Sequence, residues 1–520
     1  MSAGALFVAV LSVTALRPCG DESRPRIGRI EIVSHEIFDE DDSFWPYRWA
    51  NRLHFRTRES IIRQELLFRS GDSLDREALA QTERNLRALI VFRDARVEIF
   101  PSEKGGSGNG TVDIRVVTFD AWSTVPELRF ARIGNKLVWA MGASERNLLG
   151  RGKQIEVSRR SGLEREETFF FFQDPRLGGS RFRAVTSFST RADGRQALIS
   201  LSRPFFSLGT AWAFGFRGEG FDQLDPLYAE GERVAELRHV RRWGEVELAR
   251  AIHRAPTRAV RFHLAYRRLE DEVAGDLRRF GILQVGLSSV QHRFLKLTHV
   301  NRFERVEDFN LGNEASAFVG VSTSALGGEE GATWFCALSN RRGFRLGREH
   351  FLLGTVSWRA RRRRGRPENS LLVARLDYLN KLSPRSVVVA TAELKRGARL
   401  DPEVQLSLGA ESGLRGYPVH QWVGNRSLYL SAETRWFLAD EVAQLASFAL
   451  AAFADAGFAW PEGQSMDLRD LRADMGFGLL IGRNRLAATG PGVRLDLAYA
   501  LHPLPGRSRW LLSVGSRIGF

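Results

Sequence analysis

Residues 414–418 are Leu414, Arg415, Gly416, Tyr417 and Pro418, in a stretch rich in glycine. The guanidinium of Arg415 stays charged and presents a rigid fork of donors, so it can bind a carboxylate through two hydrogen bonds. In a partly dry space such a fork suits two carboxylates at once. Gly416 would let the backbone turn tightly beside it. We therefore expect Arg415 to have acidic partners elsewhere in the chain.

Two acids in the strand-like segments that follow meet this expectation. Side chains of a strand alternate between its two faces. In residues 428–437 the even-numbered positions are largely apolar, which leaves Glu433 on the opposite face. In residues 448–458 the even-numbered positions are all apolar, which leaves Phe453 and Asp455 opposite. Glu433 and Asp455 are predicted to face a common interior with the arginine.

Other chemistry is not supported by the sequence. Residues 150–153, Gly-Arg-Gly-Lys, lack the spacing and the Ser/Thr of a phosphate-binding loop. The ten histidines show no paired spacing for a metal, and no Gly-x-Ser-x-Gly nucleophile motif is present. Asp496 would balance an arginine rather than act in catalysis. We predict no enzymatic activity, no catalytic residue, no metal and no cofactor.

The composition points to strands in a membrane. Hydrophobic residues make up 43% of the 520 residues, yet past the N-terminus no apolar run reaches the length of a membrane helix. Only helices and closed barrels satisfy every backbone group in lipid. The net charge of +15 comes from arginines dispersed through strand-like segments. That dispersal excludes nucleic acid as a partner and suits lipid head groups and a water-filled barrel.

Residues 1–20 are expected to be a signal peptide, because residues 5–16 form an apolar run of the right length. The alternative is a buried strand of the mature domain, since no Lys or Arg precedes the run. Cys19 lacks the small preceding residues of a lipid-anchor site, and Cys336 is the only other cysteine. Two cysteines exclude a metal cluster and a disulfide framework.

Residues 24–120 form the first predicted domain, with the order strand, helix, helix, strand, strand. Asp75 is placed to cap the second helix. The elements are expected at residues 27–33, 58–68, 75–89, 95–100 and 111–117. Residues 34–57 are an insertion with four consecutive acids and several aromatic residues. The acids could bind Ca²⁺ or form a solvated loop, and the aromatics could touch a membrane, a client or the domain itself.

Residues 125–520 form the second predicted domain, a transmembrane barrel of about 16 antiparallel strands. Its segments are about ten residues long, the length of a tilted membrane strand. Apolar or aromatic residues alternate with Arg, Asp or Gly, for example in residues 212–217, 261–267 and 493–500. That alternation is the lipid-out, polar-in pattern of an outer-membrane barrel. The last strand ends on Phe520.

These motifs resemble those of the BamA/TamA family, which pairs POTRA domains with an outer-membrane barrel. The Leu-Arg-Gly-Tyr core is similar to the family's loop-six motif, and Phe453 to Gly457 matches its Phe-x-Asp-x-Gly signature. The first domain resembles one POTRA domain. The resemblance covers about residues 24–520, and its further motifs are at residues 69–75, 82–87, 147–152, 173–175 and 475–478.

The resemblance implies a mechanism. Loop six would fold back into the barrel, where Arg415 meets Glu433 and Asp455 on the lumen wall. The POTRA domain would offer a strand edge to client chains. The seam between first and last strands would lie near residues 137–145 and 510–520, where Gly142 and Gly515 would weaken the pairing.

Three functions remain open at this stage. The first is assembly or insertion of other outer-membrane proteins, with the POTRA domain in the periplasm. The second is a two-partner-type secretion pore, although such transporters usually carry two POTRA domains. The third is a passive porin or structural barrel. The expected partners are unfolded outer-membrane or secreted proteins, outer-membrane lipids including lipopolysaccharide, and accessory assembly subunits.

Four consecutive arginines, Arg361, Arg362, Arg363 and Arg364, precede a Gly-Arg-Pro turn. If loop six connects strands eleven and twelve on the cell surface, counting the strands backwards along the chain places this turn on the cell surface too. Adjacent cations repel one another unless anions are near. Lipopolysaccharide phosphates would supply those anions. The alternative is a solvated turn that keeps the strand ends soluble.

Overall fold

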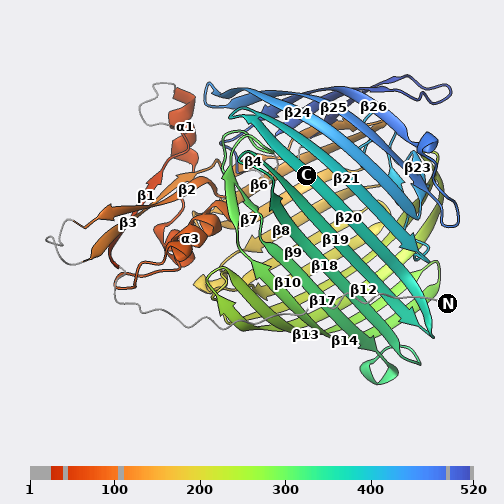
Figure 1. Cartoon of the computed structure of the whole chain (residues 1–520), viewed down its shortest axis with the longest axis horizontal. Helices are drawn as coiled ribbons and strands as arrows, with labels where there is room; N and C mark the ends of the chain where they lie inside the picture. The colour runs from red at the N-terminus through yellow and green to blue at the C-terminus, as the bar shows by residue number, and fades with distance from the viewer. Residues whose placement is uncertain (1–24, 39–44, 103–109, 488–491, 516–520) are drawn as a thin grey trace.

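The computed structural model describes residues 25–38, 45–102, 110–487 and 492–515. It consists of a small α+β domain at one end of a large closed barrel (Figure 1). The predicted signal peptide (1–20), the acidic run 39–42 and the terminal Phe520 lie outside the described residues.

The α+β domain is a three-stranded sheet with helices packed against it. Its sheet order is β1-β3-β2, with β1 parallel to β3 and β2 antiparallel to β3. The carboxylate of Asp75 accepts a 2.9 Å hydrogen bond from the Glu77 amide and caps α3 as predicted. The elements are β1 (Arg26–His35), α1 (Trp45–Leu53), α2 (Glu59–Glu65), α3 (Arg76–Ala88), β2 (Phe92–Pro101) and β3 (Thr111–Asp120).

The insertion after β1 contributes α1, a helix that the sequence did not predict. The ring of Tyr47 stacks on Phe38 with centroids 4.4 Å apart. Its hydroxyl donates a hydrogen bond to the Ala443 carbonyl, in the β24–β25 turn of the barrel. Arg485 of the barrel donates to the Ile37 carbonyl. The described part of the insertion therefore fastens the α+β domain to the barrel.

The barrel has 20 antiparallel strands, so the expectation of about 16 is wrong. Short β4 and β5 both pair with β6 and share one strand position. The strands are β4 (Thr124–Pro126), β5 (Arg129–Ile133), β6 (Lys136–Leu148), β7 (Lys153–Ser161), β8 (Glu166–Asp174), β9 (Arg183–Arg191), β10 (Gly194–Arg203), β11 (Trp212–Ala229), β12 (Glu232–Ala255), β13 (Arg258–Val273), β14 (Asp276–Gln291), β17 (Asn313–Ser322), β18 (Thr333–Arg345), β19 (His350–Arg363), β20 (Arg366–Ser383), β21 (Ser386–Ala398), β24 (Arg426–Val442), β25 (Ala446–Trp460), β26 (Arg472–Gly482), β27 (Val493–Ala500) and β28 (Trp510–Gly515).

The strand count exceeds the expectation because several hairpins turn within two residues. Glu230, Ala274 and Arg364 each have a positive φ and each precedes a glycine with a positive φ. This pair of left-handed residues is the geometry of a two-residue type I′ turn. Such turns place only two residues between neighbouring strands, so two paired strands can look like one continuous segment in the sequence.

The face of the barrel that points outward is apolar. On β24 and β25, Leu430, Trp436 and Leu450 are exposed, while Glu433 and Asp455 are buried. The predicted parity of these strands is therefore present, and it is the pattern of a membrane-spanning barrel. Within the part of the chain that the structure describes, no helix has the length and apolarity to cross a membrane.

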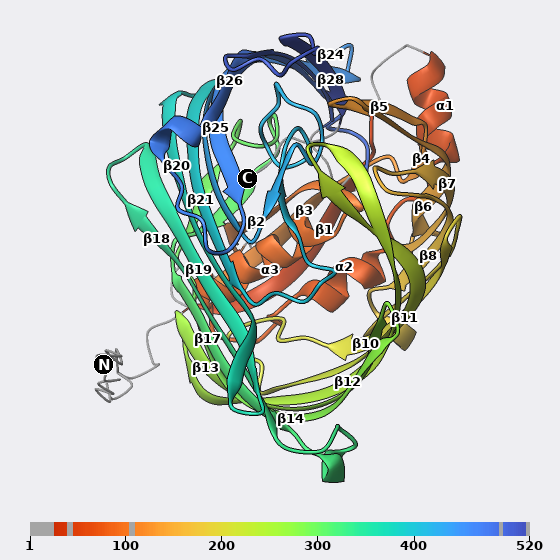
Figure 2. The same cartoon turned by 90° about the vertical axis from the view of Figure 1, so that its right-hand side faces the viewer.

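The two ends of the barrel differ. Figure 2 looks in from the end opposite the α+β domain, whose helices lie across the far opening. Loop six, residues 399–425, joins β21 to β24 at the near end and contains β22 (Leu406–Leu408) and β23 (Trp422–Gly424). Residues 292–312 join β14 to β17 at the domain end and contain β15 (Phe294–Leu297) and β16 (Glu307–Asn310). Single 3₁₀ turns are η1 (Leu177–Gly179), η2 (Ser324–Leu326) and η3 (Leu468–Asp470).

The strand directions give a test of topology. Arg364 lies in the β19–β20 turn at the loop-six end, and Gln444 lies in the β24–β25 turn at the domain end. With Cys19 and Cys336 replaced by serine, Arg364→Cys should react with an impermeant maleimide in intact cells, whereas Gln444→Cys should react only after the outer membrane is broken. Equal labelling of both positions in intact cells would contradict this strand arrangement.

Candidate functional site

Arg415 lies between the two acids that parity selected. Its Nε and Nη2 donate to the two oxygens of Asp455 at 2.7 and 3.0 Å, and its Nη1 donates to Glu433 at 2.6 Å. Its guanidinium also covers the ring of Phe453, 3.4 Å from the centroid. Burial alone would lower the pKa of Arg415, but Asp455 and Glu433 outweigh burial and hold it well above its ordinary value. The arginine is thus a fixed cation.

The residues around Arg415 are buried in the barrel. Leu414, Tyr417 and Pro418 have buried side chains, and the Tyr417 hydroxyl donates to the Ala473 carbonyl at 2.9 Å. Burial raises the pKa of Tyr417 to about 12. The motif therefore acts as a buried anchor of loop six.

Glycines in the site permit close approach. A Cβ on Gly416 would lie 2.6 Å from the Cβ of Asp474, and one on Gly457 would lie 3.1 Å from Leu408 of the loop. Gly416 has no left-handed φ, so its role differs from the tight turn expected from the sequence. These glycines instead let loop six lie against strands β25 and β26.

Sequence reasoning missed the arginines that surround Glu433. Besides Arg415, its carboxylate accepts from Arg435 at 2.6 Å and from both Nη atoms of Arg494 at 2.8 Å. Arg494 also donates to Asp496 at 2.8 Å. The alternation of side chains along the strand could have identified Arg435, because Arg435 lies two residues after Glu433 on the same face. We call these residues, with Asp455, the wall network.

A second anchor holds the opening residues of loop six. Arg361 donates to both oxygens of Asp401, at 2.6 and 3.1 Å, and Arg278 lies 3.0 Å from Asp401 and 2.9 Å from Glu403. Arg278 also lies 2.7 Å from Asp271 of β13. Ion pairs therefore hold the beginning of loop six against β14 and β19 and, through Arg278, against β13.

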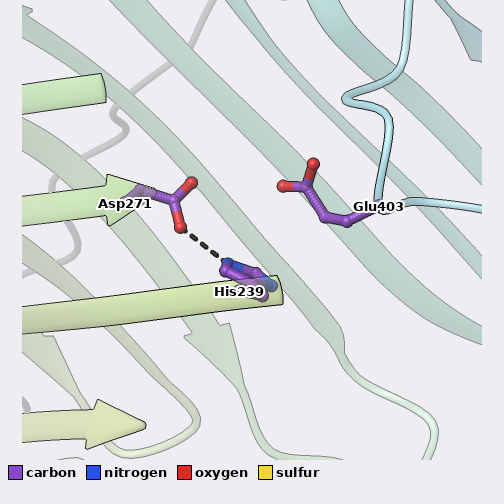
Figure 3. Close-up of side chains that lie close together, drawn as sticks. All are labelled: His239, Asp271 and Glu403. Carbon is purple, nitrogen blue, oxygen red and sulfur yellow. Dashed lines mark hydrogen bonds and ion pairs between the residues drawn. The ribbon is translucent and has the colours of Figure 1, made fainter. Parts of the chain in front are cut away.

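His239, Asp271 and Glu403 come close together at this second anchor (Figure 3), with possible ligand atoms within 4.8 Å of one another. The histidine Nε2 is 2.8 Å from Asp271. Arg241 and Arg278 already pair with Asp271, at 2.8 and 2.7 Å. Two guanidinium groups at these distances repel a metal cation, so the donor set fits an ion network rather than a metal site.

The last limb of loop six reaches the first strands. The His420 ring lies 2.8 Å from Glu164 of the β7–β8 turn. The Val419 amide donates to Asn135 of the β5–β6 turn at 3.3 Å, and the neighbouring Gly134 amide donates to Ser513 of β28 at 3.1 Å. Loop six therefore contacts the β5–β6 turn, and that turn contacts β28 across the closing seam of the barrel.

That seam lies between β5 and β28. Within the described residues, β5 and β28 share a single bridge, between Arg132 and Val514, whereas β27 and β28 pair over six residues. The seam is one strand earlier than the sequence suggested, because β4 and β5 precede β6 in the barrel. Gly142 lies on β6 inside the sheet, where a Cβ would meet the Val157 carbonyl at 2.2 Å.

Gly515 does lie on the seam strand β28, with open space beside it. A cavity of about 880 Å³ lies behind the seam. It is lined by residues 513–515 of β28, by loop six, by Glu433 and Arg494, and by four residues of β5, Arg129, Ala131, Arg132 and Ile133. The seam therefore borders a polar cavity inside the barrel.

Residues 292–312, the plug segment, enter the barrel from the domain end. Val300, Phe303 and Phe309 are buried in one apolar cluster with inward-facing side chains of the wall, among them Val389 and Phe437. Arg435 of the wall network donates to the Val300 carbonyl at 2.7 Å. The plug segment thus contacts Arg435 from one end and loop six contacts Glu433 from the other, and Arg435 itself donates to Glu433.

The α+β domain holds this plug segment. Arg87 of α3 donates to both oxygens of Asp308, at 2.8 to 3.0 Å. Lys296 lies 2.5 Å from Glu83, and the Arg84 guanidinium lies 4.1 Å from the Phe294 ring centroid. Burial alone would lower the pKa of Arg87, but Asp308 and Glu83 outweigh burial and raise it.

The four consecutive arginines lie at the loop-six end, where counting placed them. Two of them have acidic partners in the chain itself: Arg361 pairs with Asp401, and Arg363 lies 2.5 Å from Glu329. The expectation that all four need outside anions is therefore wrong for these two. Arg362 and Arg364 are exposed, and Arg362 donates to the Gly365 carbonyl.

No protein-family model and no curated protein matches this chain. Solved structures do match over nearly its whole length. BamA from Haemophilus ducreyi, lacking POTRA domains 1–3, is 12% identical with a TM-score of 0.42, and the match covers 94% of this chain and 84% of that one.

CdiB from Acinetobacter baumannii and CdiB from Escherichia coli are both 14% identical with TM-scores of 0.47. These matches cover 95% of this chain and 73% and 76% of theirs. The structural resemblance is thus to BamA- and CdiB-like barrels with an N-terminal α+β domain.

The wall network predicts a large cost for losing its central acid. Glu433→Gln removes the carboxylate charge that compensates three buried arginines, so the free energy of unfolding should fall by about 3–5 kcal/mol. The partly exposed pair of Glu329 and Arg363 is the control, and Glu329→Gln should cost less than about 1 kcal/mol. Denaturant unfolding followed by tryptophan fluorescence measures both. Equal costs would show that the network is not a stability centre.

The contact of Arg415 with Asp455 should appear as energetic coupling. A double-mutant cycle of Arg415→Ala and Asp455→Ala should give a coupling energy of about 1–3 kcal/mol in unfolding. A coupling near zero would mean that the two side chains do not meet in the folded barrel.

Proposed function

We propose that this chain is an outer-membrane protein of the BamA/TamA type that inserts or assembles other outer-membrane proteins. The α+β domain would act as a single POTRA domain in the periplasm and receive unfolded client chains. The seam between β5 and β28 would pass them into the membrane. Accessory assembly subunits are a further class of partner for the exposed surfaces of the domain.

The observation that carries this proposal is the contrast between seam and lumen. Loop six enters the lumen from one end and is held by buried ion pairs, while the plug segment enters from the other end and packs in an apolar cluster. Within the described residues, the seam strands share one bridge. An edge with free N–H and C=O groups can pair with an incoming strand. A client chain would therefore pass at the seam, because loop six and the plug segment fill the lumen from both ends.

The domain offers a second edge for client chains. Strand β2 is at the edge of the sheet order β1-β3-β2. Its Ile99 and Phe100 side chains are 41% and 38% exposed, so apolar surface flanks the edge. The other edge, β1, is partly covered, because the Ile27 amide and carbonyl bond to Asp72 and Gly71. β-augmentation at β2 would bind clients through backbone hydrogen bonds without demanding a sequence.

A two-partner-type secretion pore is the second candidate. It requires a path through the lumen, so the plug segment would have to leave the apolar cluster. A passive porin requires the same opening without a client.

At the loop-six end, Arg362 and Arg364 remain proposed contacts for lipopolysaccharide phosphates.

A covalent lock across the seam tests the insertase. In a background with Cys336 replaced by serine, the pair Arg132→Cys and Val514→Cys should form a disulfide, and assembly of client barrels should stop until a reductant is added. The control is Leu497→Cys with Leu512→Cys, which face each other across β27 and β28. That lock should leave assembly unchanged. Full assembly by the locked seam would contradict lateral insertion.

A lock on the plug segment separates the secretion pore from the insertase. His299 of the plug segment lies 3.1 Å from Asp440 of the wall. Joining cysteines at these two positions with a short bifunctional reagent should leave assembly intact if clients use the seam. Loss of client export under this lock, with the seam lock harmless, would favour the secretion pore.

A further inference from the structure

A basic pocket lies where the α+β domain meets the barrel. Its volume is about 550 Å³, and its walls are β1, the end of α2 with the residues after it, and the β8–β9 turn of the barrel. Five arginines line it: Arg29, Arg63, Arg69, Arg176 and Arg181.

The pocket has more positive charge than its own acids neutralise. Buried Glu65 accepts from Arg176 at 2.7 Å and lies 3.8 Å from Arg181, while Glu59 pairs with Arg63 at 2.7 Å. Among the described residues, the side chains of Arg29 and Arg69 have no hydrogen-bond or ion-pair partner. Burial lowers the pKa of Arg181, and the neighbouring charges of Arg176 and Arg203 lower it further against the opposing effect of Glu65.

Two polar atoms in these walls are also unsatisfied. Nη1 of Arg181 and Oε1 of Gln64 are buried and make no hydrogen bond within the described residues. A guanidinium donates and an amide oxygen accepts. A ligand that carries an anionic oxygen beside a hydroxyl or ammonium donor would satisfy both.

The pocket is connected to the membrane-facing surface. The Arg181 guanidinium lies 4.2 Å from the centroid of the Phe206 ring, which also contacts Arg203, and Arg203 lies 3.8 Å from that of Trp212. Trp212 is 44% exposed at the domain end of β11, and Leu177 in the β8–β9 turn is 43% exposed. Exposed tryptophan beside arginine is typical of the head-group level of a membrane.

We infer that this pocket binds the phosphate of a glycerophospholipid head group, drawn from the leaflet that faces the α+β domain. Arginine forks bind phosphate oxygens bidentately, and Gln64 would accept from a head-group hydroxyl or ammonium. The bound lipid would neutralise the excess charge and fasten the domain to the membrane beside the barrel. The site lies at the opposite end from the arginine run at residues 361–364, so it is separate from any lipopolysaccharide contact.

The test uses the full chain in dodecyl maltoside micelles, which carry no phosphate, titrated with short-chain phosphatidylglycerol. The variant Arg29→Gln with Arg69→Gln removes two exposed charges that have no partner within the described residues, and should weaken binding about tenfold or more. The control, Arg96→Gln with Arg115→Gln, removes the same charge from side chains of the domain that do not line the pocket, 61% and 41% exposed. It should bind within about twofold of the unmodified chain.

Inorganic phosphate and glycerol phosphate are titrated in parallel to identify the source. Binding of the lipid without competition by these soluble anions supports the head-group site. Equal affinity for glycerol phosphate alone would keep the phosphate site but overturn the lipid as its ligand. Equal weakening in both double variants, or in neither, would overturn the pocket as the site.

Discussion

One carboxylate in the lumen, that of Glu433, holds the interior of this barrel together. It accepts hydrogen bonds from Arg415 of loop six, Arg435 of its own strand and Arg494 of β27. Burying so much charge is costly unless every member is paired. Asp455 and Asp496 supply the remaining pairing, at 2.7 and 2.8 Å from Arg415 and Arg494. The cost of breaking one pair is therefore a cost to the whole set.

Loop six links the two sides of the barrel seam from inside the lumen. A closed barrel normally gains its closure from the ladder of hydrogen bonds around its full circumference. Here the seam has one bridge among the described residues, and loop six spans it from inside. Arg415 binds acidic residues of β24 and β25, and the Val419 amide donates to Asn135 of the β5–β6 turn. Loop six thus adds contacts from the lumen to those of the backbone ladder.

Much of this site followed from alternation in the sequence, since parity alone put Glu433, Phe453 and Asp455 on the lumen face. The number of strands did not follow, because two-residue turns such as Ala274-Gly275 leave almost no turn sequence. The plug segment could not be predicted, because Val300, Phe303 and Phe309 show neither a helical nor a strand period. Their burial depends on inward-facing apolar residues contributed by strands far away in the chain, which no local pattern reveals.

The same contacts join the α+β domain to the centre of the barrel. Arg87 of α3 forms an ion pair with Asp308 of the plug segment, and Arg435 donates to the Val300 carbonyl of that segment. Arg435 and Arg415 both donate to the carboxylate of Glu433. Contacts in a chain do not by themselves transmit a signal, which requires an element with two arrangements. Loop six and the plug segment are the two elements that could have a second arrangement, because both are connections between strands rather than parts of the barrel wall. A client bound to the domain could therefore influence the lumen only by changing the hold of α3 on the plug segment. One side of the seam is linked to the domain more directly, because β4 and β5 follow β3 in the chain.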